Sequence, residues 1–155
     1  MSDHDDPHPA IRSAREEDLP EIHRLDNEVF TSSPYSFLVL RQHFDAHGDH
    51  LLVRYEGESL QGYVLSAVRA DRLAGWVHSL AVAREQRGRG LGRQLMEEAL
   101  RRLDEAGVLE ARLAVEPANT PAITLYEALG FSPDGAVQQD YFGPGEERLI
   151  MSLKL

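Results

Sequence analysis

Four arginines and three glycines crowd into ten residues in the middle of this chain. Residues 84–93 read REQRGRGLGR, after an apolar run and before leucines at helical spacing. A glycine-rich turn from a strand into a helix leaves backbone N–H groups free at the positive end of the helix dipole. Such a turn binds anions, phosphate above all. Because glycines let a phosphate approach the backbone and arginines add charge-assisted hydrogen bonds, the stretch predicts a pyrophosphate site.

Two familiar phosphate-binding loops do not fit this stretch. A P-loop ends in Gly-Lys-Ser or Gly-Lys-Thr, and no such ending occurs here. The dinucleotide fingerprint G-x-G-x-x-G, counted from Gly88, needs a small residue at 93 and meets Arg93. A solvated loop that leads into a surface helix stays open as the plainer interpretation. The motifs on either side favour the phosphate site.

The flanking motifs carry a family resemblance. Residues 87–92, RGRGLG, contain the pattern R/Q-x-x-G-x-G/A, and residues 119–131, NTPAITLYEALGF, contain N-x-x-A-x-x-L-Y-x-x-x-G-F. The run WVHSLAV at 76–82 precedes the first pattern. In this order the motifs resemble those of the GNAT superfamily of acyl-CoA-dependent N-acetyltransferases, over roughly residues 10–155. The resemblance implies an α/β (α+β) fold with a single mixed, mostly antiparallel sheet of six to seven strands, flanked by about four helices.

The same resemblance implies acetyl-CoA as co-substrate and no metal. The pantetheine arm is expected against the backbone of Leu80, Ala81 and Val82. Asn119 and Tyr126 would contact that arm from its other side. A thioester arm between two strands that splay apart pairs with their unused backbone groups, which fixes the acyl carbon near an incoming amine. The coenzyme A pyrophosphate is expected on the backbone amides of Arg87, Gly88, Arg89, Gly90, Leu91 and Gly92, with Arg93 near the same phosphates.

Acyl transfer to an amine needs a base that takes a proton and an acid that gives one to the departing thiolate. By resemblance Tyr126 is the acid, and a phenol with a reference pKa of about 10 suits this role. A tyrosine that only packs on the sheet is the alternative. We expect direct attack in a ternary complex, because the chain has no cysteine and no serine in a nucleophile-elbow motif.

The base has two candidates. Some N-terminal acetyltransferases of this superfamily use a glutamate twelve residues before the tyrosine, where this chain has Ala114. Glu116 lies two residues further on and would face the same side of a regular strand. His78 is the other candidate, because HSLAV at 78–82 is similar to a stretch of the arylalkylamine acetyltransferases whose strand histidine relays a proton through water. A histidine that only packs or bonds a backbone group stays open.

The C-terminal stretch suggests an acceptor. Residues 140–153, DYFGPGEERLIMSL, resemble the ending of ribosomal-protein N-terminal acetyltransferases (RimI-like). This implies that Tyr141, Glu146 and Glu147 line the acceptor mouth, where an aromatic ring beside carboxylates suits a protonated amine. A peptide N-terminus and a small-molecule amine both stay open as acceptors. A non-catalytic acyl-CoA-binding sensor or regulatory module is the alternative function.

Helices and strands must bring these motifs together. We expect one acetyltransferase domain over 10–155, after a disordered tail at 1–9. Two last strands, 136–142 and 147–155, are expected around a GPGE hairpin turn. Runs of β-branched and aromatic residues between turn signals predict the earlier strands, over 10–15, 51–55, 62–68, 75–82 and 109–115. Apolar residues at helical spacing predict helices over 16–30, 34–48, 91–105 and 119–131, the second opened by Pro34.

The composition limits the functions that this site could serve. Among 155 residues, 16 Lys and Arg stand against 26 Asp and Glu, a net charge of -10 that disfavours nucleic-acid and membrane partners. The absence of cysteine excludes disulfides and thiol nucleophiles and permits a cytoplasmic location. No apolar run reaches the roughly 18 residues that a membrane span needs. A metal site on His43 and His47 is less favoured than a solvated helix end, and a monomer or homodimer is expected.

Overall fold

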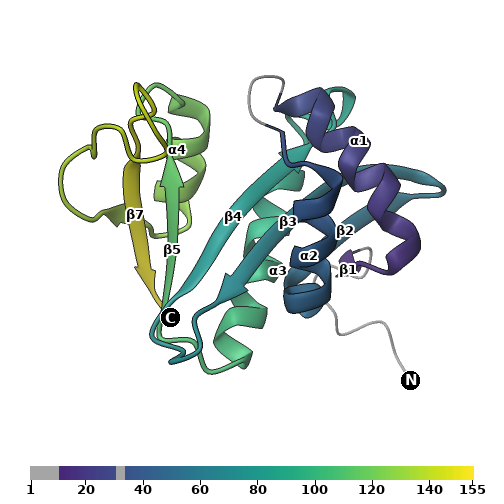
Figure 1. Cartoon of the computed structure of the whole chain (residues 1–155), viewed down its shortest axis with the longest axis horizontal. Coiled ribbons are helices and arrows are strands. Elements are labelled where there is room, and N and C mark those ends of the chain that lie inside the picture. The colour runs from purple at the N-terminus through teal and green to yellow at the C-terminus, as the bar shows by residue number, and fades with distance from the viewer. Residues whose placement is uncertain (1–10, 31–33) are drawn as a thin grey trace.

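One mixed sheet runs through the part of the chain that the computed structural model describes, residues 11–30 and 34–155 (Figure 1). The strand order is β1-β2-β3-β4-β5-β7-β6. All neighbours are antiparallel except β4 and β5, which are parallel. The expected sheet of six to seven mostly antiparallel strands is therefore confirmed. The strands are β1 Ile11–Ser13, β2 Leu51–Glu56, β3 Ser59–Val68, β4 Gly75–Val82, β5 Glu110–Val115, β6 Ser132–Pro133 and β7 Leu149–Lys154.

Two pairs of helices cover opposite faces of this sheet. Helices α1 (Leu19–Val29) and α2 (Phe37–His47) pack on one face. Helices α3 (Leu91–Glu105) and α4 (Thr120–Ala128) pack on the other face (Figure 1). Over the described residues, these four α-helices agree with the expected number.

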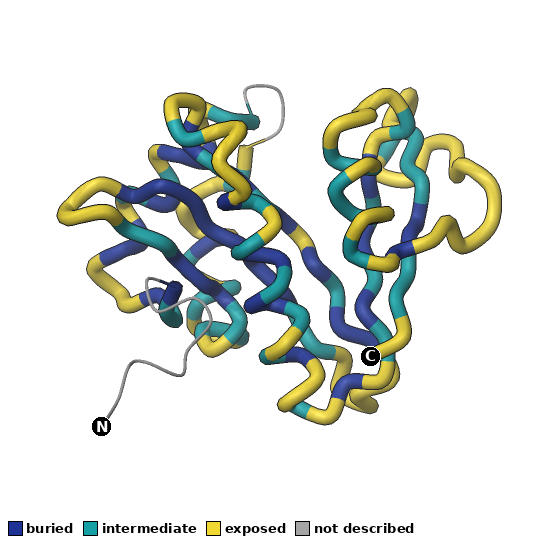
Figure 2. The backbone as a smooth tube through the Cα atoms, turned by 180° about the vertical axis from the view of Figure 1, so that it is seen from behind, coloured by how far each residue is buried: buried dark blue, intermediate teal, exposed yellow. Residues whose placement is uncertain are grey.

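Each face of the sheet has its own apolar core. In α1, Leu19, Ile22 and Leu25 recur at helical spacing and are at most 1% exposed, so one stripe of the helix faces the strands. In α3, Leu95 and Leu103 are fully buried on the opposite face. Figure 2 shows the buried backbone following the central strands, with exposed loops at their ends. Because a fully buried leucine contributes about 1.5–3 kcal/mol, these stripes hold the helices on the sheet.

The parallel strands β4 and β5 are paired over a short length and then separate. The last pair between them is Val77 with Leu113. Beyond it, β4 continues to Val82 and stays paired with β3, while β5 continues to Val115 and stays paired with β7. Figure 1 shows the two arrows diverging. The edges that face each other beyond Val77 therefore carry backbone N–H and C=O groups without a strand partner, and such groups need another partner.

Strand β4 has an irregularity at the same place. Leu65 of β3 lies opposite Ser79, and Ser66 lies opposite Val77, so His78 has no opposite residue on β3. This arrangement is a β-bulge, which bends a strand and re-aims a side chain. His78 therefore lies at the point where β4 leaves β5.

The strand expected over 136–142 is wrong. The structure has a two-residue strand at Ser132–Pro133 and, within 136–142, an isolated bridge between Gln138 and Arg148. Asp140 has a φ of 54°, in the left-handed region, and its carboxylate accepts a hydrogen bond of 2.7 Å from the backbone of the following turn. A short acidic side chain that bonds nearby backbone competes with a strand ladder, which explains the difference.

Two expected boundaries also move. Pro34 does not open α2, because the N-cap is Ser36, whose Oγ accepts a 3.2 Å hydrogen bond from the N–H of Val39. The last strand begins at Leu149, not at residue 147. The remaining helices and strands lie within a few residues of the expected ranges. The tail expected at 1–9 lies outside the described residues.

Gly62 of β3 allows a close approach of β4 and α3. A Cβ at this position would lie 2.8 Å from the carbonyl oxygen of Ala81 and 2.9 Å from Cδ1 of Leu95. We expect Gly62→Ala to lower the free energy of unfolding by about 1–3 kcal/mol in urea titrations, because the obstructing atom at 2.8 Å belongs to the backbone and not to the end of a flexible side chain.

Gly48→Ala is the matched control. A Cβ there would make ordinary contact with the ring of Phe44 at 3.6 Å, and Gly48 has a helical φ of -57°. This substitution should leave the free energy of unfolding unchanged or raise it by up to about 1 kcal/mol. Equal stability of the two variants would contradict the close approach at Gly62.

Candidate active site

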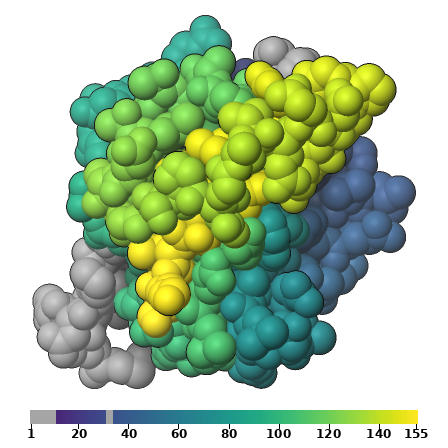
Figure 3. All heavy atoms as spheres, turned by 90° about the vertical axis from the view of Figure 1, so that its left-hand side faces the viewer, coloured from purple at the N-terminus to yellow at the C-terminus, as the bar shows by residue number. Residues whose placement is uncertain are grey.

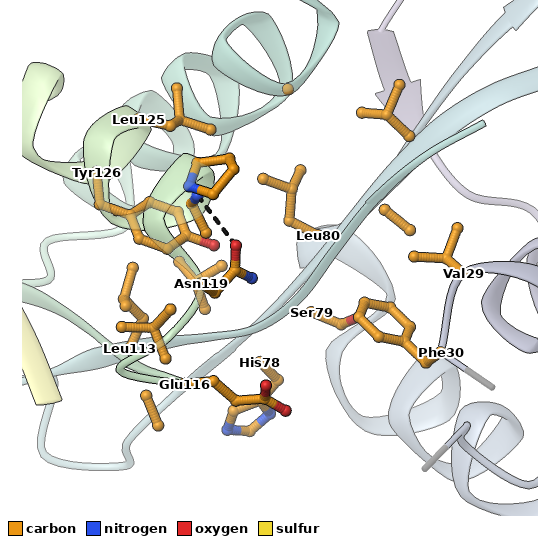
Figure 4. A pocket seen from close by; sticks show the side chains of 18 of the residues that line it. Val29, Phe30, His78, Ser79, Leu80, Leu113, Glu116, Asn119, Leu125 and Tyr126 are labelled. Atoms are coloured by element: carbon orange, nitrogen blue, oxygen red, sulfur yellow. Dashed lines mark hydrogen bonds between the residues drawn. The ribbon is translucent and has the colours of Figure 1, made fainter. Parts of the chain in front are cut away.

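A cleft lies where β4 and β5 separate. Its cavity has a volume of about 910 Å³, within the roughly 300–1,000 Å³ of ligand and cofactor sites. Side chains from β4, α4 and the end of α1 surround it (Figure 4). The structure thus brings together residues that lie far apart in the sequence. The expected site residues that line it are His78, Leu80, Ala81, Val82, Arg87, Gly88, Gly90, Leu91, Gly92, Glu116, Asn119, Tyr126 and Glu146.

Four other expected site residues do not line this cleft. Tyr141 lines a second, adjoining cavity. Arg93 forms a 2.8 Å ion pair with Glu97 along α3. Arg89 donates to the side chain of Gln86 at 3.2 Å. Glu147 also lies outside both cavities and accepts a 3.1 Å hydrogen bond from the side chain of Gln139. The roles expected for these four residues stay predictions.

The glycine-arginine loop has the backbone geometry of an anion site. Gly88 and Gly90 have φ values of 81° and 78°, which side chains disfavour. Gly90 is the N-cap of α3 and has no side chain to accept from the first N–H groups of that helix. A Cβ at either glycine would have no protein atom within 4 Å, so the space before the loop is open. These features fit a diphosphate at the start of α3.

Neighbouring side chains hold this loop in place. Gln61 of β3 is buried, and its Nε2 donates to Glu56 at 2.9 Å and to Gln86 at 3.3 Å. Arg87 donates from Nε to the carbonyl oxygen of Val82 at 3.4 Å. Sequence reasoning missed Gln61, because its partners come from a strand and a loop that meet only in the fold.

Tyr126 and Asn119 enter the cleft from the α4 side. The hydroxyl of Tyr126 points into the cavity (Figure 4), and burial raises its pKa to about 12. The phenol is therefore protonated at neutral pH and offers an O–H donor. Asn119 caps α4, because its Oδ1 accepts a 3.2 Å hydrogen bond from the N–H of Ala122. This cap uses the carbonyl oxygen and leaves the Nδ2 donor for another partner.

His78 is coupled to a second histidine that sequence reasoning did not connect with it. Nδ1 of His78 lies 3.3 Å from Nε2 of His43 on α2, and the two rings are edge to face at 5.1 Å. The open cleft leaves part of His78 accessible, but surrounding protein desolvates the ring. Desolvation, and then the charges of His43 and His47, lower the pKa of His78 to about 4. The imidazole is therefore neutral at neutral pH and has a lone pair to share.

Glu116 follows the end of β5 and meets an arginine. Nη2 of Arg148 lies 3.7 Å from Glu116 and 3.2 Å from Glu146. The guanidinium carbon lies 5.0 Å from the ring centre of Phe142. Arg148 is 14% exposed while the Glu116 side chain is 63% exposed, so the ion pair lies at the rim of the cleft. Sequence reasoning missed Arg148, which links the end of β5 with the turn before β7.

A buried carboxylate lies under the other wall of the cleft. Asp26 of α1 is 2% exposed and accepts hydrogen bonds from the hydroxyl of Tyr63 and from the N–H of Tyr35, the latter at 2.6 Å. The Tyr63 hydroxyl lies 2.9 Å from Oγ of Ser79 on β4. Desolvation, and then the charge of Asp26, raise the pKa of Tyr63, so its proton stays in place. This network ties the segment before α2 to the floor of the cleft.

The chain matches a known protein family over most of its length. The model of the acetyltransferase (GNAT) family matches residues 11–131. The chain belongs to this family. It is an acetyl-CoA-dependent N-acetyltransferase, so the expected fold, activity and co-substrate are confirmed.

Individual relatives of this GNAT enzyme are acetyltransferases with different acceptors. An N-alpha-acetyltransferase of Saccharolobus solfataricus is 29% identical over 157 residues, which cover 94% of this chain and 92% of the relative. Streptothricin acetyltransferase of Streptomyces lavendulae is 31% identical over 176 residues, which cover 92% and 93%. The ribosomal-protein-S18-alanine N-acetyltransferase of Escherichia coli superposes with a TM-score of 0.78 at 25% identity, covering 93% and 92%. None of these names supports the non-catalytic sensor.

Two further features concern metals and membranes. Among residues 11–30 and 34–155, no group of three or more histidine, aspartate and glutamate side chains is arranged to hold a metal ion. In the same part of the GNAT enzyme, none of the helices combines the length and the apolar character that crossing a membrane requires.

Gly90 tests the coenzyme loop. We expect Gly90→Val to raise the Kd for acetyl-CoA at least about tenfold in calorimetric titrations, because the side chain strains the left-handed backbone and enters the space before α3. Gly57→Val is the matched control, since Gly57 also has a positive φ, 60°, with no protein atom near its Cβ position, but lies in the β2–β3 turn. Wild-type affinity in Gly90→Val would contradict the loop assignment.

The histidine pair predicts an unusual titration. In NMR experiments, the ring of His78 should titrate with a midpoint near pH 4, below the reference value of about 6.5. His43→Ala should move this midpoint upward, because the change lets water reach the ring of His78 and removes the charge of His43, which also lowers the pKa of His78. A midpoint near 6.5 in the unaltered protein would contradict the desolvated pair.

Proposed function

We propose that this GNAT enzyme acetylates the amino terminus of a peptide or protein, by direct attack of the neutral amine on the thioester of acetyl-CoA in a ternary complex. One observation carries the proposal: the glycine-arginine loop, the separated edges of β4 and β5, and the Tyr126 hydroxyl line one continuous cavity. Such a cavity holds a long thioester and leaves its acyl end open to an amine. The names of the relatives from Saccharolobus solfataricus and Escherichia coli support an amino-terminal acceptor.

The coenzyme would occupy the cleft along its length. Its pyrophosphate would take the N–H groups between Arg87 and Gly92, and the open space before Gly88 and Gly90 supports this. Its pantetheine arm would pair with the free edge of β4, from Leu80 to Val82, beyond the last pair with β5. Asn119 and Tyr126 would contact the arm from α4. In this arrangement the thioester lies near the bulge at His78.

Tyr126 would act as the acid and His78 as the base, through a water molecule. As the amine nitrogen bonds to the acetyl carbon, the carbon–sulfur bond breaks and the sulfur takes a proton from the Tyr126 hydroxyl. The proton of the amine passes to the neutral His78 imidazole. Glu116 is the alternative base, held by Arg148 at 3.7 Å. His78 is favoured because it lies at the bulge where the strands part.

The acceptor would enter from the side opposite the loop. Tyr141, Glu146 and Glu147 would form the mouth, where carboxylates attract a protonated amine before it loses its proton.

We also propose that residues 10–155 form one domain, that the enzyme works in the cytoplasm as a monomer or homodimer, and that it does not bind nucleic acid. Its net charge of -10 supports the last point.

Release of free thiol tests the function. Purified enzyme is mixed with acetyl-CoA and either peptides with a free amino terminus, the same peptides with a blocked amino terminus, or streptothricin. We expect thiol release with free peptides only. Thiol release with streptothricin alone would show that the acceptor is a small-molecule amine and not a peptide. Binding of acetyl-CoA without any thiol release would favour the non-catalytic acyl-CoA sensor.

Tyr126→Phe tests the acid. We expect kcat to fall by about 10- to 10⁴-fold while the affinity for acetyl-CoA stays nearly constant, because only the proton donor is lost. Tyr55→Phe is the matched control: burial also raises the pKa of Tyr55 to about 12, but this residue lies on β2 near Asp18, outside the cleft. Unchanged kcat in Tyr126→Phe would remove this residue as the acid.

A further inference from the structure

A second cavity opens beside the cleft. Its volume is about 440 Å³. An apolar cavity of about 150 Å³ is enough to hold a benzene ring, so this one has room for a large side chain. In Figure 3 the segment that follows β6 overhangs the side of the molecule where α2 lies, and the cavity lies between these two parts. Its main walls are Tyr35, His43, Trp76, Ala114, Tyr141 and Phe142.

The two cavities meet where the strands part. Tyr35, Val77, His78, Ala114 and Phe142 line both of them, and Val77 belongs to the last pair between β4 and β5. The glycines of the coenzyme loop, Gly88 and Gly90, line the cleft only. A group in the second cavity therefore lies next to the proposed reaction centre, at the end away from the pyrophosphate loop.

The walls of the second cavity are uncharged. In the part of the chain that the structure describes, none of its lining side chains is a carboxylate, an ammonium or a guanidinium group. Desolvation lowers the pKa of His43 and of His78, so both rings are neutral at neutral pH. Desolvation raises the pKa of Tyr35, which keeps its proton. A charged group that loses hydration here would find no opposite charge among the lining side chains.

The aromatic walls of the second cavity differ: Trp76 is supported by neighbouring side chains, whereas Phe142 is exposed to solvent. The guanidinium of Arg112 lies 5.3 Å from the ring centre of Trp76 and is itself held by Asp134 at 2.7 Å, so the indole has a firm support. Phe142 is 63% exposed and contacts the ring of Tyr141 edge to face at 4.7 Å. Exposed aromatic rings at the mouth of a cavity gain stability when an apolar ligand covers them.

Ala114 gives this cavity part of its room. It lies on β5 opposite Ile150 of β7, and its side chain is a single methyl group at the border of the two cavities. A longer side chain at this position, such as the glutamate that some N-terminal acetyltransferases use, would extend into the shared space. The alanine therefore leaves this chain with an uncharged and wider passage beside the acceptor amine.

We propose that the second cavity receives the first side chain of the acceptor peptide and selects amino termini that begin with a large uncharged residue, aromatic or long aliphatic. This inference rests on the proposed amino-terminal acetylation. Burial of such a side chain in place of alanine favours binding in the transition state by about 10- to 100-fold. Peptides that begin with aspartate or lysine are the poorest substrates, because the cavity offers no opposite charge.

A set of peptides that differ only in the first residue tests the proposal. The first residue is Phe, Leu, Ala, Asp or Lys, and kcat/KM is measured by thiol release with saturating acetyl-CoA. We expect Phe and Leu to exceed Ala by at least about tenfold, and Asp and Lys to fall below Ala. Equal values, or a preference for Ala, overturn the proposal and leave amino-terminal acetylation in place. Failure to acetylate any peptide overturns both.

Two matched variants identify the cavity as the cause. Phe142→Ala should lower the ratio of kcat/KM between the Phe and Ala peptides toward one, because the wall that covers the side chain is lost. Phe37→Ala, at an exposed phenylalanine of α2 that lines neither cavity, should leave this ratio unchanged. An unchanged ratio in Phe142→Ala contradicts the assignment of this cavity, and a similar fall in both variants does so as well.

Discussion

The separation of β4 from β5 after Val77 is the constraint on which the rest of the site depends. Parallel neighbours in a sheet normally satisfy each other's backbone groups, and each buried group left without a partner costs about 1–3 kcal/mol. Here each strand keeps its other neighbour, β3 or β7, so the sheet survives the gap. In the proposed function, the thioester arm of acetyl-CoA would pair with these two rows of backbone groups. The bulge at His78, the start of α3 and the side of α4 are all arranged around this opening.

Desolvation by surrounding protein keeps Tyr126 and His78 uncharged, although the open cleft leaves His78 accessible to solvent. The pKa of Tyr126 rises to about 12 and that of His78 falls to about 4, in both cases chiefly through desolvation. At neutral pH the first group holds its proton and the second lacks one, which is the state that an acid and a base need before the reaction. The carboxylates of Glu116 and Glu146 stay at the rim with Arg148. In the proposed mechanism, charge at the rim would attract the amine, and these neutral groups would handle the proton.

The parts of the site that the sequence predicts are local. A helix N-terminus and left-handed glycines need only neighbouring residues, so the loop from Arg87 to Gly92 could be read directly. Tyr126 and Asn119 followed from a motif within one short helix. By contrast, His43 contacts His78, which lies 35 residues away, and Arg148 contacts Glu116 across the neighbouring strands β5 and β7, so no local sequence pattern predicts either contact. The buried network around Asp26 was missed for the same reason.

The segment before β7 shows where local pattern fails. A hairpin around the GPGE turn predicted a strand at 136–142, but Asp140 adopts a left-handed φ and its carboxylate accepts a hydrogen bond from the turn that follows. This irregular segment carries Tyr141 and Phe142, which line the second cavity. The irregular segment therefore supplies two aromatic walls of the second cavity.

Hydrogen–deuterium exchange with and without acetyl-CoA tests the central claim most directly, because it reports on backbone amides of β4 and of the loop. If the coenzyme pairs with the separated edge of β4 and with the start of α3, the amides of residues 78–82 and 87–93 exchange more slowly in its presence, while those of β1 and β2 do not change. Binding that leaves both of these segments exchanging at their original rates would contradict the claim that the separated strands form the coenzyme site.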